Sequence, residues 1–296
     1  HAPHRDPLTG IDYSPDGRTI ISSDPRGRVV LWRFAGGRPQ VEQIHFDNRA
    51  TLIRPLAMAG NAHAVFPRYT GDALARKPDG SKVAVATYSV QYYDMRAEQT
   101  ADLGTTHYEY VTALAASDDG KWIASADGAR NLYLFDVGGG GAKRFTLAKG
   151  HVVIGLSLND NGRYLAVGTM GEAGRQPPQI QIWDTTTRKQ LFAVRMHRAV
   201  TAVAISGDGQ WLAASGGKNH HAYLWQLRGG RPLKAQPRIL RGGARITRVQ
   251  STANARSHRA KIETSAGKAH WFNPSAMDDQ PLSEDALEAR AMVVEG

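Results

Sequence analysis

Apolar and polar residues alternate in short runs along most of the chain, and the runs come in groups of three. Residues 200–227, VTAVAISGDGQWLAASGGKNHHAYLWQL, show the clearest group. Two alternating runs on either side of a Gly-containing turn predict an antiparallel β-hairpin. The third run ends in an aromatic residue, here Trp225. Each group therefore predicts three neighbouring strands of one antiparallel sheet.

Copies of this unit recur at a period of roughly 40 to 46 residues, which is typical of a β-propeller. Five copies carry Asp-Gly or Asn-Gly at the first turn, where both residues tolerate positive φ. The alternative is an ordinary antiparallel sandwich, but sandwich strands do not repeat in threes with an aromatic residue at one fixed place. The six readable copies lie at residues 8–34, 72–95, 111–137, 153–184, 200–227 and 246–272.

The repeat resembles that of the WD40 family over residues 8–272. Trp183-Asp184 is the family's dipeptide in literal form, and Gly150-His151 is its Gly-His pair. The resemblance implies a buried network of a His, a Ser or Thr, an Asp and the Trp within each blade. Incomplete sets are present at Ser23, Asp24 and Trp32, at Ser125 and Asp127 with Phe135 at the Trp place, and at Ser215 and Trp225. A satisfied buried polar network specifies packing, so we expect a structural role for these residues.

The resemblance implies an all-β fold, a WD40-type β-propeller with six readable, four-stranded antiparallel blades; seven blades are the alternative. We expect residues 1–296 to form a single domain. Residues 47–71 exceed what a connection needs, and we interpret them as an insertion loop, with a decayed blade as the alternative. Residues 277–291 are predicted to form an acidic, partly helical tail. Met292–Glu295 are then expected to pair as the outer strand of the first blade and to close the ring.

The amino-acid composition excludes only a few classes of protein. The 296 residues include no cysteine, which excludes disulfides and cysteine-based metal sites. Apolar runs are too short for a membrane-spanning helix, and no signal-peptide pattern is present. We therefore expect a cytoplasmic protein, or a domain or subunit of a larger assembly. The abundance of Arg and Ala suggests a bacterial source.

Positive charge is concentrated near the end of the chain. The formal net charge is +10, and residues 228–268 carry eleven Lys or Arg against the single acid Glu263. Three interpretations stay open: a solvated surface covered by the acidic tail, a face for an acidic partner, or a nucleic-acid site. Nucleic acid is the weakest of the three, because no aromatic residues are interleaved for base stacking. The basic patch comprises Arg228, Arg231, Arg238, Arg241, Arg245 and Arg248.

One face of a propeller is built by the loops that enter the first strand and by those that join the second strand to the third. The longer connections of this chain fall in such loops, where binding residues usually lie. Adjacent histidines at positions 220 and 221 point to opposite faces of a strand and lack a carboxylate, so we expect no metal there. The predicted partner-binding residues are Arg49, Arg54, Arg68, Tyr69, Arg175, Gln176, Lys218, His220 and His221.

Catalytic motifs are missing from the sequence. It contains no GxSxG, HExxH or GxxxxGK[ST] motif, and the residues at the strand starts make a poor ligand set for a central metal. We predict a non-catalytic protein–protein interaction domain, a scaffold or sensing module of a larger protein or complex, without a cofactor. Two alternatives remain: a hydrolase- or lactonase-like propeller enzyme with a site in the central channel, or an anion- or nucleic-acid-binding protein that uses residues 228–268.

Overall fold

The computed structural model describes residues 3–35, 38–46, 55–76, 80–147, 150–171, 176–196, 199–216, 221–234, 237–240, 246–254, 257–264 and 269–272. These residues contain no helix and form six antiparallel sheets. The chain divides into two compact units, residues 1–153 and 154–296, with the boundary inside strand β13. A single domain over residues 1–296 therefore stays a prediction.

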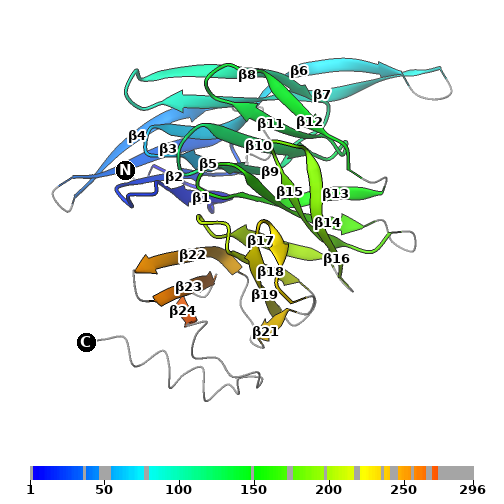
Figure 1. The fold of residues 1–296 in the computed structure, drawn as a ribbon. Helices are drawn as coiled ribbons and strands as arrows, with labels where there is room; N and C mark the ends of the chain where they lie inside the picture. Colours follow the sequence, from blue (N-terminus) through cyan, green and yellow to red (C-terminus); the bar gives the residue numbers. More distant parts are fainter. Residues whose placement is uncertain are drawn as a thin grey trace. The chain divides into compact units, whose positions relative to one another are not determined.

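Three sheets belong to the first unit (Figure 1). Each strand pairs with the next one along the chain, which suits short hairpin connections. The strands of the first sheet are β1 (Gly10–Tyr13), β2 (Thr19–Ser23), β3 (Arg28–Ala35) and β4 (Arg38–Phe46). Those of the second are β5 (Ala57–Ala59), β6 (His63–Arg76), β7 (Lys82–Asp94) and β8 (Gln99–His107). Those of the third are β9 (Val111–Ala116), β10 (Trp122–Asp127), β11 (Leu132–Asp136) and β12 (Ala142–Phe145).

The remaining strands follow the same order along the chain. A fourth sheet contains β13 (His151–Leu158), β14 (Tyr164–Gly171), β15 (Gln179–Asp184) and β16 (Lys189–Arg195). A fifth contains β17 (Val200–Ile205), β18 (Trp211–Gly216), β19 (His221–Arg228) and β20 (Arg231–Pro232), with β21 (Arg238–Leu240) also paired to β19. The last contains β22 (Ile246–Asn254), β23 (Ser257–Thr264) and β24 (Ala269–Phe272).

A short polar motif builds the first hairpin of several sheets. Between β1 and β2, the Ser14 hydroxyl donates to the Asp16 carboxylate at 2.6 Å, and Gly17 adopts a φ of 69°. The same arrangement recurs at Ser117 and Asp119 and at Ser206 and Asp208, each at 2.6 Å. The predicted Asp-Gly turns are therefore confirmed at these three hairpins, since only glycine adopts this φ without steric cost.

The core lies between neighbouring sheets. Alanines of the second strands, such as Ala124 in β10 and Ala213 in β18, are fully buried and allow the backbones to approach. Larger side chains from the flanking strands fill the remaining space. One cluster in the first unit joins Val65 of the second sheet to Ile123 and Phe135 of the third. Burial of such side chains stabilises by roughly 1.5–3 kcal/mol each.

The interpretation of residues 47–71 as an insertion is wrong for residues 57–59 and 63–71, which form β5 and the first part of β6. Residues 47–54 lie outside the described part of the chain. The first turn of this sheet is at Gly60, and the connection at Asp79-Gly80 instead joins the second strand to the third. Asp-Gly marks a hairpin but does not say which hairpin of a repeat it closes.

The outer edge of the first sheet, where Met292–Glu295 were expected to pair, already carries another strand. Strand β4 already pairs along the outer edge of β3, from Arg28 opposite Phe46 to Ala35 opposite Arg38. That edge is therefore occupied by the strand that follows it in sequence. Residues 277–296 lie outside the described part of the chain.

Candidate interaction surface

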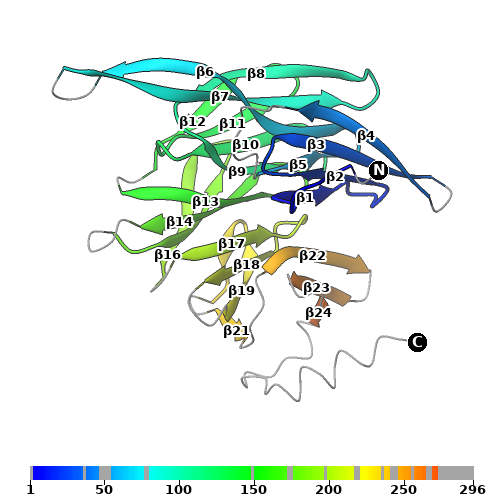
Figure 2. The same ribbon diagram turned by 180° about the vertical axis from the view of Figure 1, so that it is seen from behind.

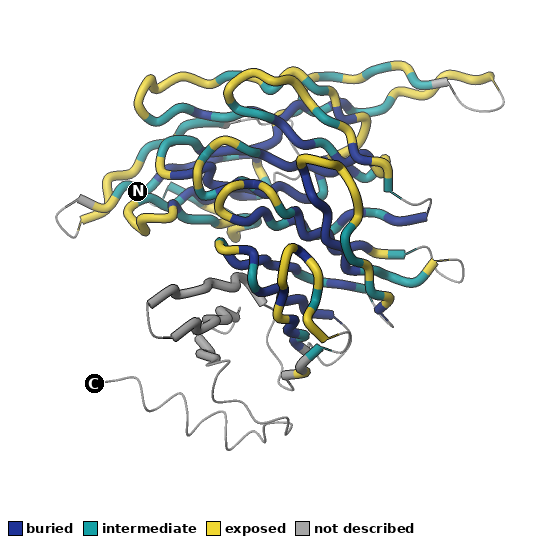
Figure 3. Tube along the Cα trace, in the orientation of Figure 1, coloured by how far each residue is buried: buried dark blue, intermediate teal, exposed yellow. Residues whose placement is uncertain are grey.

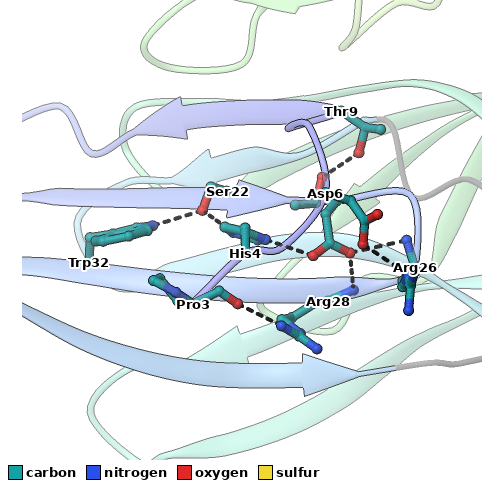
Figure 4. Close-up of polar contacts among 10 residues, drawn as sticks. Pro3, His4, Asp6, Thr9, Ser22, Arg26, Arg28 and Trp32 are labelled. Atoms are coloured by element: carbon teal, nitrogen blue, oxygen red, sulfur yellow. Dashed lines mark hydrogen bonds and ion pairs between the residues drawn. The ribbon is translucent and has the colours of Figure 1, made fainter. Parts of the chain in front are cut away.

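A buried polar network connects the start of the chain to the first sheet (Figure 4). His4 Nδ1 lies 2.9 Å from the Asp24 carboxylate, which can only accept, and His4 Nε2 lies 2.8 Å from the Ser22 hydroxyl. The indole N–H of Trp32 donates to the same Ser22 oxygen at 2.7 Å. An ion pair of 2.9 Å between Arg26 and Asp6 secures the same segment at the surface.

The third sheet repeats this network without a tryptophan. His107 lies 2.8 Å from both the Asp127 carboxylate and the Ser125 hydroxyl, and all three side chains are fully buried. Phe135 occupies the Trp place, as predicted, and Asn131 donates to Asp127 at 2.9 Å. Complete burial leaves no access for a ligand, so these groups fix the packing of the sheet.

Ser22, not Ser23, completes the first network, and the prediction for Ser23 is wrong. Successive side chains of a strand point to opposite faces, so only a residue two positions before Asp24 shares its face. Ser23 instead contacts the hydroxyl of Thr9 at 3.2 Å. His4 was missed, although a signal exists: it precedes the serine by 18 residues and the aspartate by 20, as His107 does.

The predicted partner-binding residues fall into three groups. Arg68 and Tyr69 lie on β6, exposed and half-buried respectively, and Gln176 is exposed just before β15. His221 begins β19, but its side chain is not described. Outside the described residues lie Arg49, Arg54, Arg175, Lys218 and His220. The structure therefore brings together only Arg68 and Tyr69.

These two residues stand on a long hairpin, which we call the arm. It is the pair β6 and β7, whose 14 and 13 residues exceed the 4 to 9 residues of every strand in the first and third sheets. The arm extends beyond the neighbouring strands of the first unit (Figure 1). At its base, the rings of Tyr69 and Tyr88 meet edge to face at 5.8 Å.

The loop between β8 and β9 adds two exposed tyrosines beside the arm. Strand β8 ends at His107, opposite Tyr88, and is followed directly by Tyr108 and Tyr110, whose side chains are 52% and 53% exposed. The loop between β10 and β11 lies against this segment, because the N–H of Gly128 donates to the carbonyl of Tyr110 at 3.2 Å. We call Tyr69, Tyr88, Tyr108 and Tyr110 the tyrosine cluster.

Arg130 stands in this second loop with a φ of 71°, in the left-handed region. The matching turn between β2 and β3 has Gly27 there, with a φ of 78°. In both turns the residue donates to the preceding aspartate carbonyl, at 3.2 Å for Arg130 and 3.1 Å for Gly27. A side chain in this conformation costs about 1 kcal/mol, and such strain is found at functional sites.

Arg130 contributes a positive charge to this surface, and Glu109, whose carboxyl group lies beside Gly128 of the same loop as Arg130, contributes a negative one. Arg130 is exposed, and its guanidinium forms no ion pair with any carboxylate in the part of the chain that the structure describes. Burial, together with the positive charge of Arg130, lowers the pKa of His151. Burial also raises the pKa of Tyr133, whose ring meets His107 edge to face at 5.2 Å. The surface thus combines tyrosine phenols with an unpaired arginine, the residue types enriched at protein interfaces.

The basic patch is described only in part. Arg228 and Arg231 are exposed at the paired ends of β19 and β20. Arg238 and Arg248 lie in β21 and β22, where side chains are not described, and Arg241 and Arg245 lie outside the described residues. Whether the six arginines form one surface therefore stays a prediction.

The described residues lack two further features. They contain no group of three or more His, Cys, Asp or Glu side chains placed to hold a metal ion. They also contain no helix with the length and apolar character needed to cross a lipid bilayer.

Comparison with known proteins agrees with the repeat. The family model described as "WD domain, G-beta repeat" matches three separate segments, residues 1–33, 100–136 and 188–226. A solved chain from the "Crystal Structure of Mitotic Checkpoint Complex" superposes with a TM-score of 0.59 at 15% identity, covering 90% of this chain and 74% of that one. The fold is therefore a β-propeller, as the sequence predicted.

Two curated proteins are similar to this chain. The Protein LST8 homolog of Drosophila melanogaster is 25% identical over 161 residues, 53% of this chain and 49% of that protein. The WD repeat-containing protein 26 homolog of Arabidopsis thaliana is 18% identical over 79% of this chain and 36% of its own length. The chain is similar to the WD40-repeat family in the three matched segments, and it spans less than half the length of these two relatives.

Proposed function

We propose that this WD40 propeller is a non-catalytic protein-interaction domain, a scaffold or sensing module of a larger protein or complex. The tyrosine cluster and Arg130 are its binding surface. The observation that carries the proposal is Arg130, an exposed charged side chain held at positive φ where the equivalent turn has glycine. Strain of this kind persists where a specific side chain is required.

The surface suits a protein partner with acidic groups. Tyrosine supplies a large rigid contact area at little cost in conformational entropy, and arginine binds carboxylates in a bidentate manner. The relative in the solved structure is part of an assembly that its title calls a complex, which supports a protein partner for this propeller too. A cytoplasmic location stays a prediction, and a propeller enzyme and anion or nucleic-acid binding through residues 228–268 stay the alternatives.

The test uses the full chain as bait for proteins of its source organism, with quantitative mass spectrometry as the readout. We expect partners captured by the wild type to fall at least about tenfold with the double variant Tyr108→Ala/Arg130→Gly, the loss expected when interface anchors are removed. Arg188→Gly is the matched control, since Arg188 is also exposed with positive φ, at 56°, in the β15–β16 turn. Equal capture by the wild type and the double variant contradicts this binding surface.

A further inference from the structure

The outer half of the arm is a ribbon of only two strands. Residues 71–76 of β6 pair with residues 82–87 of β7. Strand β8 pairs with β7 only from Tyr88 onward, and β5 pairs with β6 only at residues 63–65. Within the described part of the first unit, both edges of the ribbon are therefore open, as the arm at the upper left of Figure 2 shows.

This ribbon exposes apolar residues. Leu74 is 70% exposed and Val83 is 36% exposed, and cross-strand neighbours such as Ala73 and Val85 are small or β-branched. Figure 3 shows the ribbon as exposed or intermediate along its length. A two-stranded ribbon is only marginally stable in water, so a third strand would add both backbone hydrogen bonds and apolar burial.

The two open edges differ in how they are protected. On the β6 edge, Pro67 lacks a backbone donor, and the register shifts between Tyr69 and Gly71, where Gly71 has a φ of 131°. Proline and bulges are the features with which proteins protect an edge strand. On the β7 edge, Lys82–Thr87 has neither, and it carries alternating β-branched residues that favour pairing.

The chain itself marks where a further strand would begin. Strand β8 leaves the β7 edge at His107, and Tyr108 turns away toward β9. A strand added to Lys82–Thr87 would thus continue the line of β8 and start beside the exposed Tyr108. We infer that the β7 edge binds an extended peptide segment of a partner protein by strand addition; this inference rests on the proposed function and extends it.

Charge indicates the chemistry of this peptide. Lys82, the first residue of β7, is basic and exposed. An acidic residue in the peptide would complement this end of the arm, and alternating apolar residues would match Val83 and Val85. A second copy of the chain fits less well, because two chains of net charge +10 repel each other.

The experiment pans a random-peptide phage library on the full chain and measures the affinity of synthetic copies of enriched peptides by fluorescence anisotropy. We expect an enriched pattern of alternating apolar residues with an acid. Binding should be lost when residues 73–76 and 82–85 are deleted together. This deletion removes four cross-strand pairs, an even number, so the rest of the arm keeps its faces.

Two single variants distinguish the loss of a donor on the open edge from the loss of a hydrogen bond within the ribbon. Successive N–H groups of a strand point alternately to its two neighbours. Of Ala84→Pro and Val85→Pro, one therefore removes a donor from the open edge and the other removes one from the ribbon. The edge variant should weaken peptide binding about tenfold, the effect of one to two hydrogen bonds, while the thermal midpoint stays unchanged.

Three outcomes would overturn the inference. The first is no enriched pattern on the wild type. The second is an enriched peptide that binds the arm-deleted chain as tightly as the wild type but does not bind the variant Tyr108→Ala/Arg130→Gly. The proposed surface, and not the arm, would then be the binding site. The third is a dimer in sedimentation velocity that disappears on arm deletion, which would make a second copy the occupant.

Discussion

At the residue scale, the alternation of side chains along a strand decides which polar groups meet. Ser22 and Asp24 share a face and bind the same histidine, whereas Ser23 points to the opposite face. The sequence identified the right element and the right chemistry but the wrong serine. The spacing of two between Ser125 and Asp127, which was correctly predicted, already contained the rule.

Ser22→Ala should lower the free energy of unfolding by about 1–3 kcal/mol, because Trp32 Nε1 and His4 Nε2 would both lose a buried partner. Ser23→Ala is the control and should cost less, since the contact of its hydroxyl with Thr9, at 3.2 Å, is longer than either contact of the Ser22 hydroxyl. Urea unfolding measures both. Equal losses would show that the network around Ser22 contributes no additional stability.

Asp24 should make stability depend on pH. Burial raises the pKa of Asp24, but hydrogen bonds from His4 and from the backbone of Arg28 and Arg26 outweigh burial and bring the pKa below its ordinary 3.8. A lowered pKa in the folded state means that the stabilisation is present above 3.8 and disappears as the pH falls through the lower folded value. The difference in thermal midpoint between wild type and Asp24→Asn should therefore be constant near neutral pH and shrink below 3.8. A difference that persists in acid contradicts this assignment.

The tryptophans of the repeat have different hydrogen-bond partners. Trp32 donates to Ser22, and Trp183 donates to Gln181 at 2.9 Å. Trp225 is 2% exposed, and its indole N–H has no acceptor among the residues that the structure describes. In the first sheet, Trp32 pairs with Ile20, and its acceptor Ser22 lies two positions further along the same strand. In the fifth sheet, Trp225 pairs with Leu212, so the residue at the equivalent position is Ala214.

Ala214→Ser should therefore stabilise the protein by about 1 kcal/mol, because the new hydroxyl can accept from Trp225. Ala166→Ser is the matched control: Ala166 is buried in the same apolar cluster, and its cross-strand partner is Ile182. That variant should destabilise, since its hydroxyl is buried among apolar groups. Thermal unfolding of both variants tests the assignment, and stabilisation by Ala166→Ser alone would refute it.

At the element scale, turns of neighbouring sheets pack directly on one another. The N–H of Gly60, between β5 and β6, donates to the carbonyl of Ser117 at 3.2 Å. A Cβ atom on Gly60 would lie 3.2 Å from Asp118 O and from Gly120 Cα. Only glycine permits this approach together with a φ of 57°.

Gly60→Ala should destabilise by more than about 2 kcal/mol, because it combines an unfavourable φ with crowding against backbone. Gly17→Ala is the control, with a φ of 69° but no atom within 4 Å of the added Cβ, and should cost about 1 kcal/mol. Chemical denaturation compares the two. Equal losses would mean that the contact between the turns is easily relaxed.

Also at this scale, the sequence predicted the strands better than their places in the repeat. Periodicity located the aromatic third strands, such as Leu132–Asp136, within a few residues. It misplaced the second sheet, because β6 and β7 continue far beyond the core and put Asp79-Gly80 on another hairpin. The local sequence pattern indicates that two strands are joined by a turn. It does not indicate which sheets they pack against, because that depends on contacts between residues far apart in sequence.

At the scale of the whole molecule, the fold class followed from the repeat, but the interaction surface that we propose did not. Repetition fixes the architecture because each unit must bury its apolar face against the next. The surface arises from departures that have no periodic signal: an extended hairpin, exposed tyrosines after β8, and an arginine in place of a turn glycine. Of the predicted contact residues, only Arg68 and Tyr69 are placed together by the described structure.

Removing the outer half of the arm should leave the stability of the molecule unchanged. Leu74 and Val83 are exposed, and the buried clusters of the first unit use β6 and β7 only from residue 64 to 66 and from residue 88 to 93. Deleting residues 73–76 with 82–85 should therefore leave the thermal midpoint unchanged within about 1 °C, less than a loss of about 1 kcal/mol would produce in a chain of this length. A larger fall in calorimetry would place the outer arm in the cooperative core.

The left-handed Arg130 has an evolutionary consequence. Gly27 shows that the relaxed form of the same turn is available elsewhere in the chain. Selection for heat tolerance alone would favour Arg130→Gly, which releases about 1 kcal/mol of strain. The proposed surface would then lose the positive charge of Arg130, while the thermal stability of the protein increased. Variants chosen only for robustness should therefore be the first to become poor binders.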